Sequence, residues 1–147
     1  EDILSTHYNT LSKLNCILAS IEANKLNYDE GIMNDPFGNI STCNSTNLFF
    51  IKNGQVLTST GKFCLNGITR SKALLVCDKN GIFYKETDFI FEDIENCEEA
   101  FVTGTFAGII PVSKIEKRSL QSTDSGSLVN KIRLLYNKHI QEYINTQ

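Results

Sequence analysis

Residues 65–70 (Leu-Asn-Gly-Ile-Thr-Arg) constrain the fold more than any other stretch, because they run directly into a helical pattern that ends near Asn80-Gly81. At a helix start the first backbone N–H groups have no partner within the helix. Those groups, the helix dipole and the Thr69 hydroxyl together predict a site for an anion. The alternative interpretation is that Thr69 is an ordinary N-cap. A second loop at residues 102–105 (Val-Thr-Gly-Thr) follows an expected strand and favours the anion site, because it can close over the same anion.

Apolar periodicity and turn signals predict one domain that mixes helices and strands, in a chain of 147 residues with 41% apolar residues. Asn53-Gly54 predicts a tight hairpin, and Asp35-Pro36-Phe37-Gly38 predicts a turn. The expected helices are 11–26, 69–80, 91–96 and 127–143, and the expected strands are 3–8, 30–34, 46–52, 55–58, 82–87, 100–103, 108–112 and 113–117.

Two of these helices have apolar faces that we expect to be buried. The first helix carries Leu11, Leu14, Leu18 and Ile21 along one face, so Leu18→Ala is expected to cost ~2–5 kcal/mol of stability. In the closing helix the residues expected to point inward are Leu128, Ile132, Leu135, Ile140 and Tyr143.

Charge and cysteine content exclude several classes of function. The net charge is −3, which argues against nucleic acid or an anionic membrane as a partner. No apolar run reaches transmembrane length, and no signal peptide is expected at the start. The chain has an odd number of cysteines, five, and no pair has CxxC spacing, so we expect no disulfide framework. The two histidines are far apart in the sequence, so we also expect no metal site. A reducing, cytoplasmic location is the expectation.

Several motifs, taken in order, resemble one known family. They are Asn44-Ser45-Thr46-Asn47-Leu48-Phe49, then residues 65–70, then Glu99-Ala100-Phe101-Val102-Thr103-Gly104-Thr105, and then Ile110-Pro111-Val112. This order resembles the class IV aminotransferases, the fold-type IV pyridoxal-phosphate enzymes that include branched-chain and D-amino-acid aminotransferases and aminodeoxychorismate lyases. The resemblance implies that residues 1–147 correspond to the larger, C-terminal domain, with the smaller N-terminal domain absent. It also implies a mixed α and β fold with a curved, barrel-like sheet flanked by helices.

The resemblance implies a cofactor, substrates and a binding site. The cofactor would be pyridoxal phosphate, with binding to this chain expected to be weak or absent. The substrate would be an amino acid or oxo acid, and the assembly a homo-oligomer. Ile68 and Thr69 would form one wall of a cup for the phosphate group, and Thr105 the other. Leu65 would pack on the cofactor ring, and Phe106 would lie in the loop that meets the substrate carboxylate.

Two groups that the family chemistry requires are missing at the matching positions. Asn9 stands where the resemblance places the lysine that binds the cofactor covalently, and an amide is not a nucleophilic amine. Thr42 stands in place of the glutamate that holds the ring nitrogen protonated, and a hydroxyl carries no charge to stabilise that proton. Lys13 would lie near the phenolic oxygen of the cofactor.

Three functional hypotheses therefore remain open. The first is an aminotransferase-like domain that keeps the phosphate cup but is inactive as it stands, a pseudoenzyme. The second is an active pyridoxal-phosphate aminotransferase or lyase represented by a truncated or altered chain. The third is a structural or partner-binding domain without a ligand. Neither the amino donor and acceptor nor the reason for the loss of lysine follows from the sequence.

Overall fold

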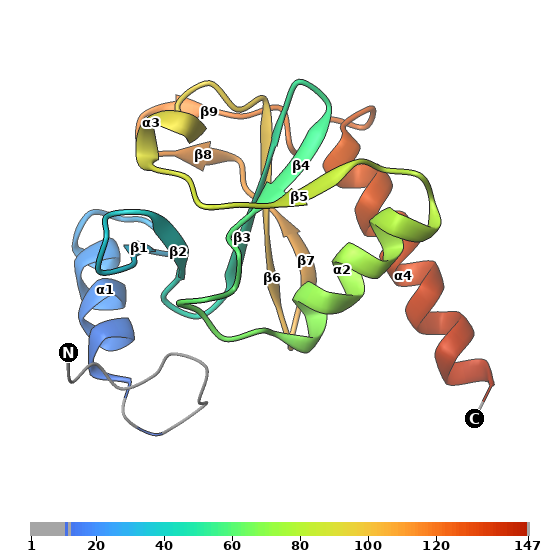
Figure 1. Ribbon diagram of the computed structural model, residues 1–147, viewed down its shortest axis with the longest axis horizontal. Coiled ribbons are helices and arrows are strands. Elements are labelled where there is room, and N and C mark those ends of the chain that lie inside the picture. Colours follow the sequence, from blue (N-terminus) through green and yellow to red (C-terminus); the bar gives the residue numbers. More distant parts are fainter. Residues whose placement is uncertain (1–10, 12, 147) are drawn as a thin grey trace.

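A five-stranded sheet forms the centre of the computed structural model, which describes residue 11 and residues 13–146 (Figure 1). Helices and two small two-stranded sheets surround it. In chain order the elements are α1 (Leu14–Lys25), β1 (Ile32–Asn34), β2 (Ile40–Cys43), β3 (Asn47–Lys52), β4 (Gln55–Thr58), α2 (Ile68–Lys79), β5 (Tyr84–Glu86), α3 (Phe91–Ile94), β6 (Glu99–Gly104), β7 (Gly108–Pro111), β8 (Lys114–Ile115), β9 (Arg118–Ser119) and α4 (Leu128–Asn145).

The central sheet has the strand order β5-β4-β3-β6-β7 and does not close into a barrel. Every neighbouring pair is antiparallel except β4 and β5, which are parallel and are connected through α2. The smaller sheets pair β1 with β2 and β8 with β9. The expected mixed fold, a curved sheet flanked by helices, is confirmed.

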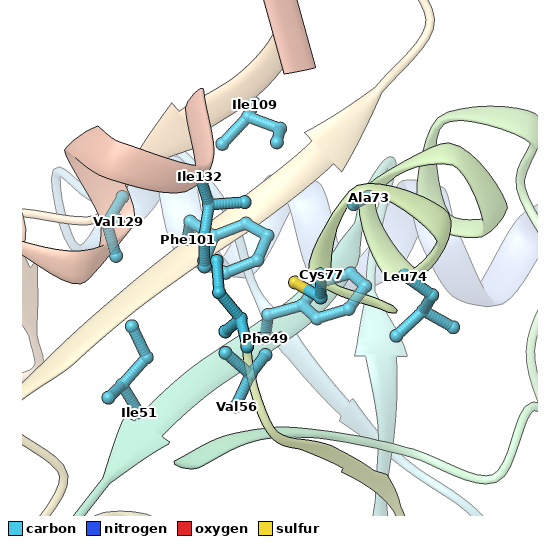
Figure 2. Close-up of a cluster of buried hydrophobic side chains, with 11 residues drawn as sticks. Phe49, Ile51, Val56, Ala73, Leu74, Cys77, Phe101, Ile109, Val129 and Ile132 are labelled. Carbon is cyan, nitrogen blue, oxygen red and sulfur yellow. The ribbon is translucent and has the colours of Figure 1, made fainter. Parts of the chain in front are cut away.

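One hydrophobic cluster lies between the central sheet and the helices α2 and α4 (Figure 2). Phe49 of β3 and Phe101 of β6 are fully buried, and their rings stack with centroids 4.6 Å apart. Val129 and Ile132 of α4 cover them from one side and Ala73 of α2 from the other. Alternate residues of a strand face opposite sides of a sheet. The odd-numbered residues of β3 and β6 therefore lie on this face, together with Phe49 and Phe101.

The even-numbered residues of β3 and β6 build a second cluster on the opposite face of the sheet. Leu48 and Phe50 of β3 meet Ala100 and Val102 of β6 there. Phe89 packs edge-on against the Phe50 ring, with centroids 4.6 Å apart. The two layers explain why β3 is apolar almost without interruption: both of its faces are buried.

The two turns expected from the sequence are confirmed. Asn53 and Gly54 both have positive φ, 52° and 72°, as a two-residue hairpin between β3 and β4 requires. In the other turn, the Asp35 carboxylate accepts hydrogen bonds from the backbone N–H groups of Phe37 and Asn39, at 2.8 and 2.9 Å. Burial alone raises the Asp35 pKa, but these bonds and one from the Asn39 side chain outweigh it, so the pKa is lowered.

The predicted orientation of α1 is wrong. Leu14, Leu18 and Ile21 are 64%, 54% and 46% exposed. The opposite face, which has small side chains, packs on the protein instead: Ala23 is buried, and Ala19 lies so close to Gly31 that a β-carbon there would be 3.0 Å from the Ala19 carbonyl oxygen. The stability cost expected for Leu18→Ala assumed that Leu18 is buried, so that prediction is wrong.

Other expectations differ in detail. The sequence reasoning missed β2 and β9, and the strand expected at 113–117 is the two-residue β8. In α4, Ile132 is buried as expected, but Tyr143 is 56% exposed and lies beneath the Lys72 ammonium. The strand expected at 3–8 lies outside the described residues. None of the helices that the structure describes is both long and apolar enough to cross a membrane.

Candidate functional site

The first turn of α2 is open at its amino end. Its N-cap is Gly67, no side chain caps it, and the turn contains no acidic residue. The first helical hydrogen bond runs from the Ser71 N–H to the Gly67 carbonyl, at 3.0 Å. The N–H groups of Ile68, Thr69 and Arg70 precede that bond, so they are the groups that a helix leaves without an internal partner. Thr69 is the second residue of the helix, and the alternative interpretation of Thr69 as the N-cap is wrong.

Asn47, at the start of β3, connects the loop before α2 to the central sheet. Its Nδ2 donates a hydrogen bond to the Leu65 carbonyl at 2.9 Å. In the β3–β6 register, Asn47 lies opposite Thr103. The loop before α2 and the end of β6 therefore meet at one edge of the sheet, where the start of α2 lies beside the β6–β7 hairpin (Figure 1). Nothing local in the sequence marks Asn47 for this role.

Thr105 and Phe106 occupy the turn between β6 and β7. Both side chains are exposed, and Phe106 is fully so at 105%. Leu65 is 42% and Ile68 81% exposed on the other loop of this edge. The loop predicted at residues 102–105 is wrong for residues 102–104, which are the end of β6, and only Thr105 lies in the turn. The structure brings this turn and the loop before α2 to the same edge, with apolar side chains open to solvent. That a single anion touches both Thr69 and Thr105 stays a prediction.

A polar group without a partner lies at the same edge. Thr103 Oγ1 is buried and has no hydrogen-bond partner within the described part of the chain. Alternation along β6 places Thr103 on the same face as Phe101, which is the face that α2 covers. Unpartnered buried hydroxyls are rare in folded proteins, so this one marks the edge as a place where a polar ligand or water would be accommodated.

Arg70 holds the first turn of α2 against two other segments. It is 4% exposed; its Nη2 donates to the Ser59 carbonyl at 2.7 Å and forms an ion pair with Glu86 of β5. Its Nη1 donates to Asn66 Oδ1 at 3.4 Å. Sequence reasoning assigned no role to Arg70, although a charged residue in an apolar helical pattern is a signal for such a buried pair.

Thr42 lies on β2 with its hydroxyl already engaged. Thr42 Oγ1 donates to the Thr46 carbonyl at 2.7 Å. Nearby, the Glu30 carboxylate accepts hydrogen bonds from the Ser45 hydroxyl and, at 3.2 Å, from the Ser45 N–H. Burial, and secondly the negative charge of Glu30, raise the pKa of the Cys43 thiol to about 12. This thiol is therefore protonated at neutral pH and is no candidate nucleophile.

The remaining candidate residues lie at the start of the described chain. Asn9 is outside the described residues. Lys13 immediately precedes α1, its side chain is exposed, and it makes no capping hydrogen bond. Across residues 11 and 13–146, no group of three His, Cys, Asp or Glu side chains is arranged to hold a metal ion.

The chain belongs to the class IV aminotransferases: residues 4–115 match the family described as Amino-transferase class IV. It is 35% identical over 132 residues to "Branched-chain-amino-acid aminotransferase-like protein 2" of Arabidopsis thaliana, covering 90% of this chain and 23% of that protein. It is 32% identical to the branched-chain-amino-acid aminotransferase of Pseudomonas aeruginosa, covering 84% of this chain and 40% of that one.

Solved structures agree with this assignment. The branched-chain amino acid aminotransferase of Thermobaculum terrenum, in its PLP holo-form, superposes with a TM-score of 0.86 at 25% identity, covering 94% of this chain and 46% of that one. The chain has a class IV aminotransferase-like fold, and homologous structures bind pyridoxal phosphate. It spans between about a quarter and about half of the length of the relatives named here.

Proposed function

We propose that this chain is a cofactor-binding domain of the class IV aminotransferase type that recognises the phosphate group of pyridoxal phosphate but does not catalyse transamination. The observation that carries the proposal is the uncapped first turn of α2, which lies at the same sheet edge as the β6–β7 turn. Open N–H groups at a helix start form a favourable site for a phosphate. The buried, unpartnered Thr103 hydroxyl fits a polar group at this edge.

The proposed roles follow the predicted residues. The backbone N–H groups of Ile68 and Thr69, with the Thr69 hydroxyl, bind the phosphate from one side, and Thr105 binds it from the other. Leu65, part-exposed beside them, packs on the ring, and Phe106 shapes the entry for a substrate carboxylate. When bound, pyridoxal phosphate acts as an electron sink for reactions of amino acids.

The inactivity that we propose rests on Asn9 and Thr42. An asparagine side chain cannot replace a nucleophilic lysine. Thr42 donates its hydroxyl to the Thr46 carbonyl and carries no negative charge, so it cannot hold a proton on a ring nitrogen as a carboxylate does. Lys13 is exposed, and its side chain makes no capping hydrogen bond at the start of α1.

The partners and setting of the chain are proposed by family likeness. We propose an amino acid or oxo acid as the small-molecule partner, with branched-chain amino acids favoured by the Pseudomonas aeruginosa relative. We also propose self-association and a cytoplasmic location. The five free cysteines, four of them buried, support a reducing compartment.

A partner-binding domain is the second candidate function. The specific observation in its favour is the exposed apolar face of α1, formed by Leu14, Leu18 and Ile21. An active enzyme represented by an altered chain is the third.

Reduction with borohydride in the presence of pyridoxal phosphate, followed by peptide mapping, separates these candidates. The matched variant is Asn9→Lys. We expect label at position 9 in that variant and only low, scattered label on exposed lysines in the parent chain. Because weak binding is expected, the pyridoxal phosphate concentration is varied, and a saturable label is the criterion for a specific site.

Two results would contradict the proposal. Saturable label on Lys13 of the parent chain would show that the reactive amine lies there and that Asn9 is not the loss of function. The second comparison uses a chain that also has the smaller N-terminal domain of the family. Transamination by its Asn9→Lys variant at the rate of its Asn9→Lys/Thr42→Glu variant would show that Thr42 does not lie at the ring nitrogen.

A further inference from the structure

Gly67 is the N-cap of α2, and the backbone conformation at this position does not require a glycine. Its φ is −60° and its ψ is 142°, an extended conformation that any residue adopts and that N-cap residues ordinarily have. Asparagine, aspartate and serine are the residues most favoured at this position, and threonine and glycine come next, but glycine has no side chain to accept a hydrogen bond. The backbone therefore permits a capping side chain that the sequence does not supply.

Space explains the glycine. A β-carbon at position 67 would lie 2.6 Å from Oδ1 of Asn47, far inside van der Waals contact. Asn47 itself is only 8% exposed and cannot move freely, because its Nδ2 is bonded to the Leu65 carbonyl and lies 3.6 Å from the Cys64 sulfur. The Asn47 side chain thus occupies the volume in which a capping side chain would begin.

The other long helix near the central sheet shows the opposite arrangement. At the start of α4, the Ser127 hydroxyl accepts the Asn130 N–H at 3.1 Å. The Glu99 carboxylate accepts the N–H groups of Leu128 and Val129, at 3.0 and 2.8 Å. The chain therefore caps α4 with its own side chains and keeps such side chains away from α2.

We propose that Asn47 is a positioning residue that, together with Gly67, keeps the first turn of α2 free of any internal cap, so that an anionic ligand takes the place of the cap. Asn47 also fixes the loop carrying Leu65 relative to β6, since it pairs with Thr103 across the sheet. The inference rests on the proposed phosphate site, and it adds the residue that keeps that site open.

The test combines two measurements on four chains: the parent, Gly67→Ser, Asn47→Ala and the double variant. Urea unfolding measures whether Asn47 excludes a side chain at position 67. NMR titration with inorganic phosphate, and separately with pyridoxal phosphate, measures binding at the amides of residues 68–70. Gly126→Ser is the matched control, because a β-carbon at Gly126 would have nothing within 4 Å.

We expect Gly67→Ser to destabilise the parent and to be neutral or stabilising in the Asn47→Ala background, where the serine has room to cap α2. We expect the double variant to bind phosphate at least tenfold more weakly than Asn47→Ala alone, because the serine hydroxyl occupies the open N–H groups. Gly126→Ser should leave both stability and phosphate binding unchanged.

Each failure has a distinct meaning. Equal destabilisation by Gly67→Ser in both backgrounds would overturn the exclusion by Asn47. A double variant that binds phosphate as well as Asn47→Ala would overturn competition between a cap and the anion. Absence of amide shifts at residues 68–70 in the parent, with either ligand, would overturn the proposed function. It would also overturn the role of Asn47 in anion binding. The unfolding data would still decide whether Asn47 excludes a side chain at position 67.

Discussion

Arg70 shows how much of the candidate site depends on one buried side chain. Its guanidinium connects the first turn of α2 to Ser59 in the preceding loop and to Glu86 in β5. Nε of Arg70 is buried without a partner in the described residues, so the group depends on its remaining bonds. A planar group with several donors suits such a junction, whereas lysine would reach only part of it.

Arg70→Ala is expected to lower the free energy of unfolding by about 2–4 kcal/mol, because the Ser59 carbonyl loses its donor and Glu86 loses its ion-pair partner. Urea unfolding measures this change. Arg133→Ala, at an exposed position of α4, is the control and should stay within about 0.5 kcal/mol of the parent. An equal effect of both substitutions would show that the Arg70 junction does not stabilise the fold.

The raised pKa values of the Cys43 and Cys77 thiols predict that the stability of the fold depends on pH in the alkaline range. Burial raises the pKa of the Cys43 thiol to about 12, with a second contribution from the charge of Glu30, and burial raises that of Cys77 to about 11. In the unfolded chain both thiols ionise near 9.0. The folded state therefore binds more protons than the unfolded state between pH 9 and these values, and stability is lost as the pH rises through that window.

Cys43→Ala should flatten this loss by up to about 1.4 kcal/mol per pH unit above pH 9. Urea unfolding at two pH values, one below and one above pH 9, measures the slope. Val102→Ala removes volume from the same cluster without removing a thiol, so it should lower stability equally at both pH values. An unchanged slope in Cys43→Ala would mean that Cys43 does not cause the pH dependence.

At the scale of elements, the two helices on one face of the sheet begin in different ways. Glu99 and Ser127 cap α4, whereas no side chain caps α2. The Glu99 carboxylate also lies at the positive end of the α4 helix dipole, where a negative charge is stabilising. The start of α4 is therefore a structural feature, and the start of α2 is available for a ligand.

Glu99→Ala is expected to cost about 1–2 kcal/mol of stability, because two N–H groups of α4 lose their acceptor. Glu99→Gln keeps an acceptor oxygen and should lose less. Thermal or urea unfolding measures both, and Glu142→Ala, exposed near the end of α4, serves as the control. A Glu99→Ala variant as stable as Glu142→Ala would exclude this capping role.

Elements with a strong local signal were predictable from the sequence. The Asn53-Gly54 turn defined β4 at its observed bounds, since both residues tolerate the positive φ that the hairpin needs. The short strands β2 and β9 lack such a signal and form through pairing with neighbours. Likewise the start of α2 was visible from Gly67 and Thr69, but the role of Asn47 depends on a contact with Leu65, 18 residues later. The periodicity of apolar residues within an element carries no information about a contact between residues so far apart in the sequence.

At the scale of the whole molecule, α1 is attached by its small side chains and turns its large apolar ones outward. The period of the pattern predicted a helix correctly but could not tell which face packs, because Cys16, Ala19 and Ala23 repeat with the same period as Leu14, Leu18 and Ile21. An exposed apolar face of this kind is typical of an interaction surface, and we expect the proposed self-association to use it.

Leu18→Ala is therefore expected to change stability by less than about 1 kcal/mol. A Leu14→Ser/Leu18→Ser variant should be monomeric at concentrations where the parent chain self-associates, which sedimentation velocity measures. Lys131→Ser/Arg133→Ser, on exposed positions of α4, is the control. A parent chain that stays monomeric throughout would contradict self-association through α1.

The parallel pairing of β4 with β5 has a consequence for the order in which the chain folds. The antiparallel strands β3 and β4 are joined by a two-residue turn, so they can pair early in folding. β5 reaches its place beside β4 only after α2 has crossed the sheet, and that long loop must close first. β5 has three residues and lies at the edge of the sheet with a neighbour on one side only, whereas β3 and β6 have neighbours on both sides. The amides of β5 should therefore exchange with solvent sooner than those of β3 and β6, and the strand that opens most easily is the one whose Glu86 pairs with Arg70 at the start of α2.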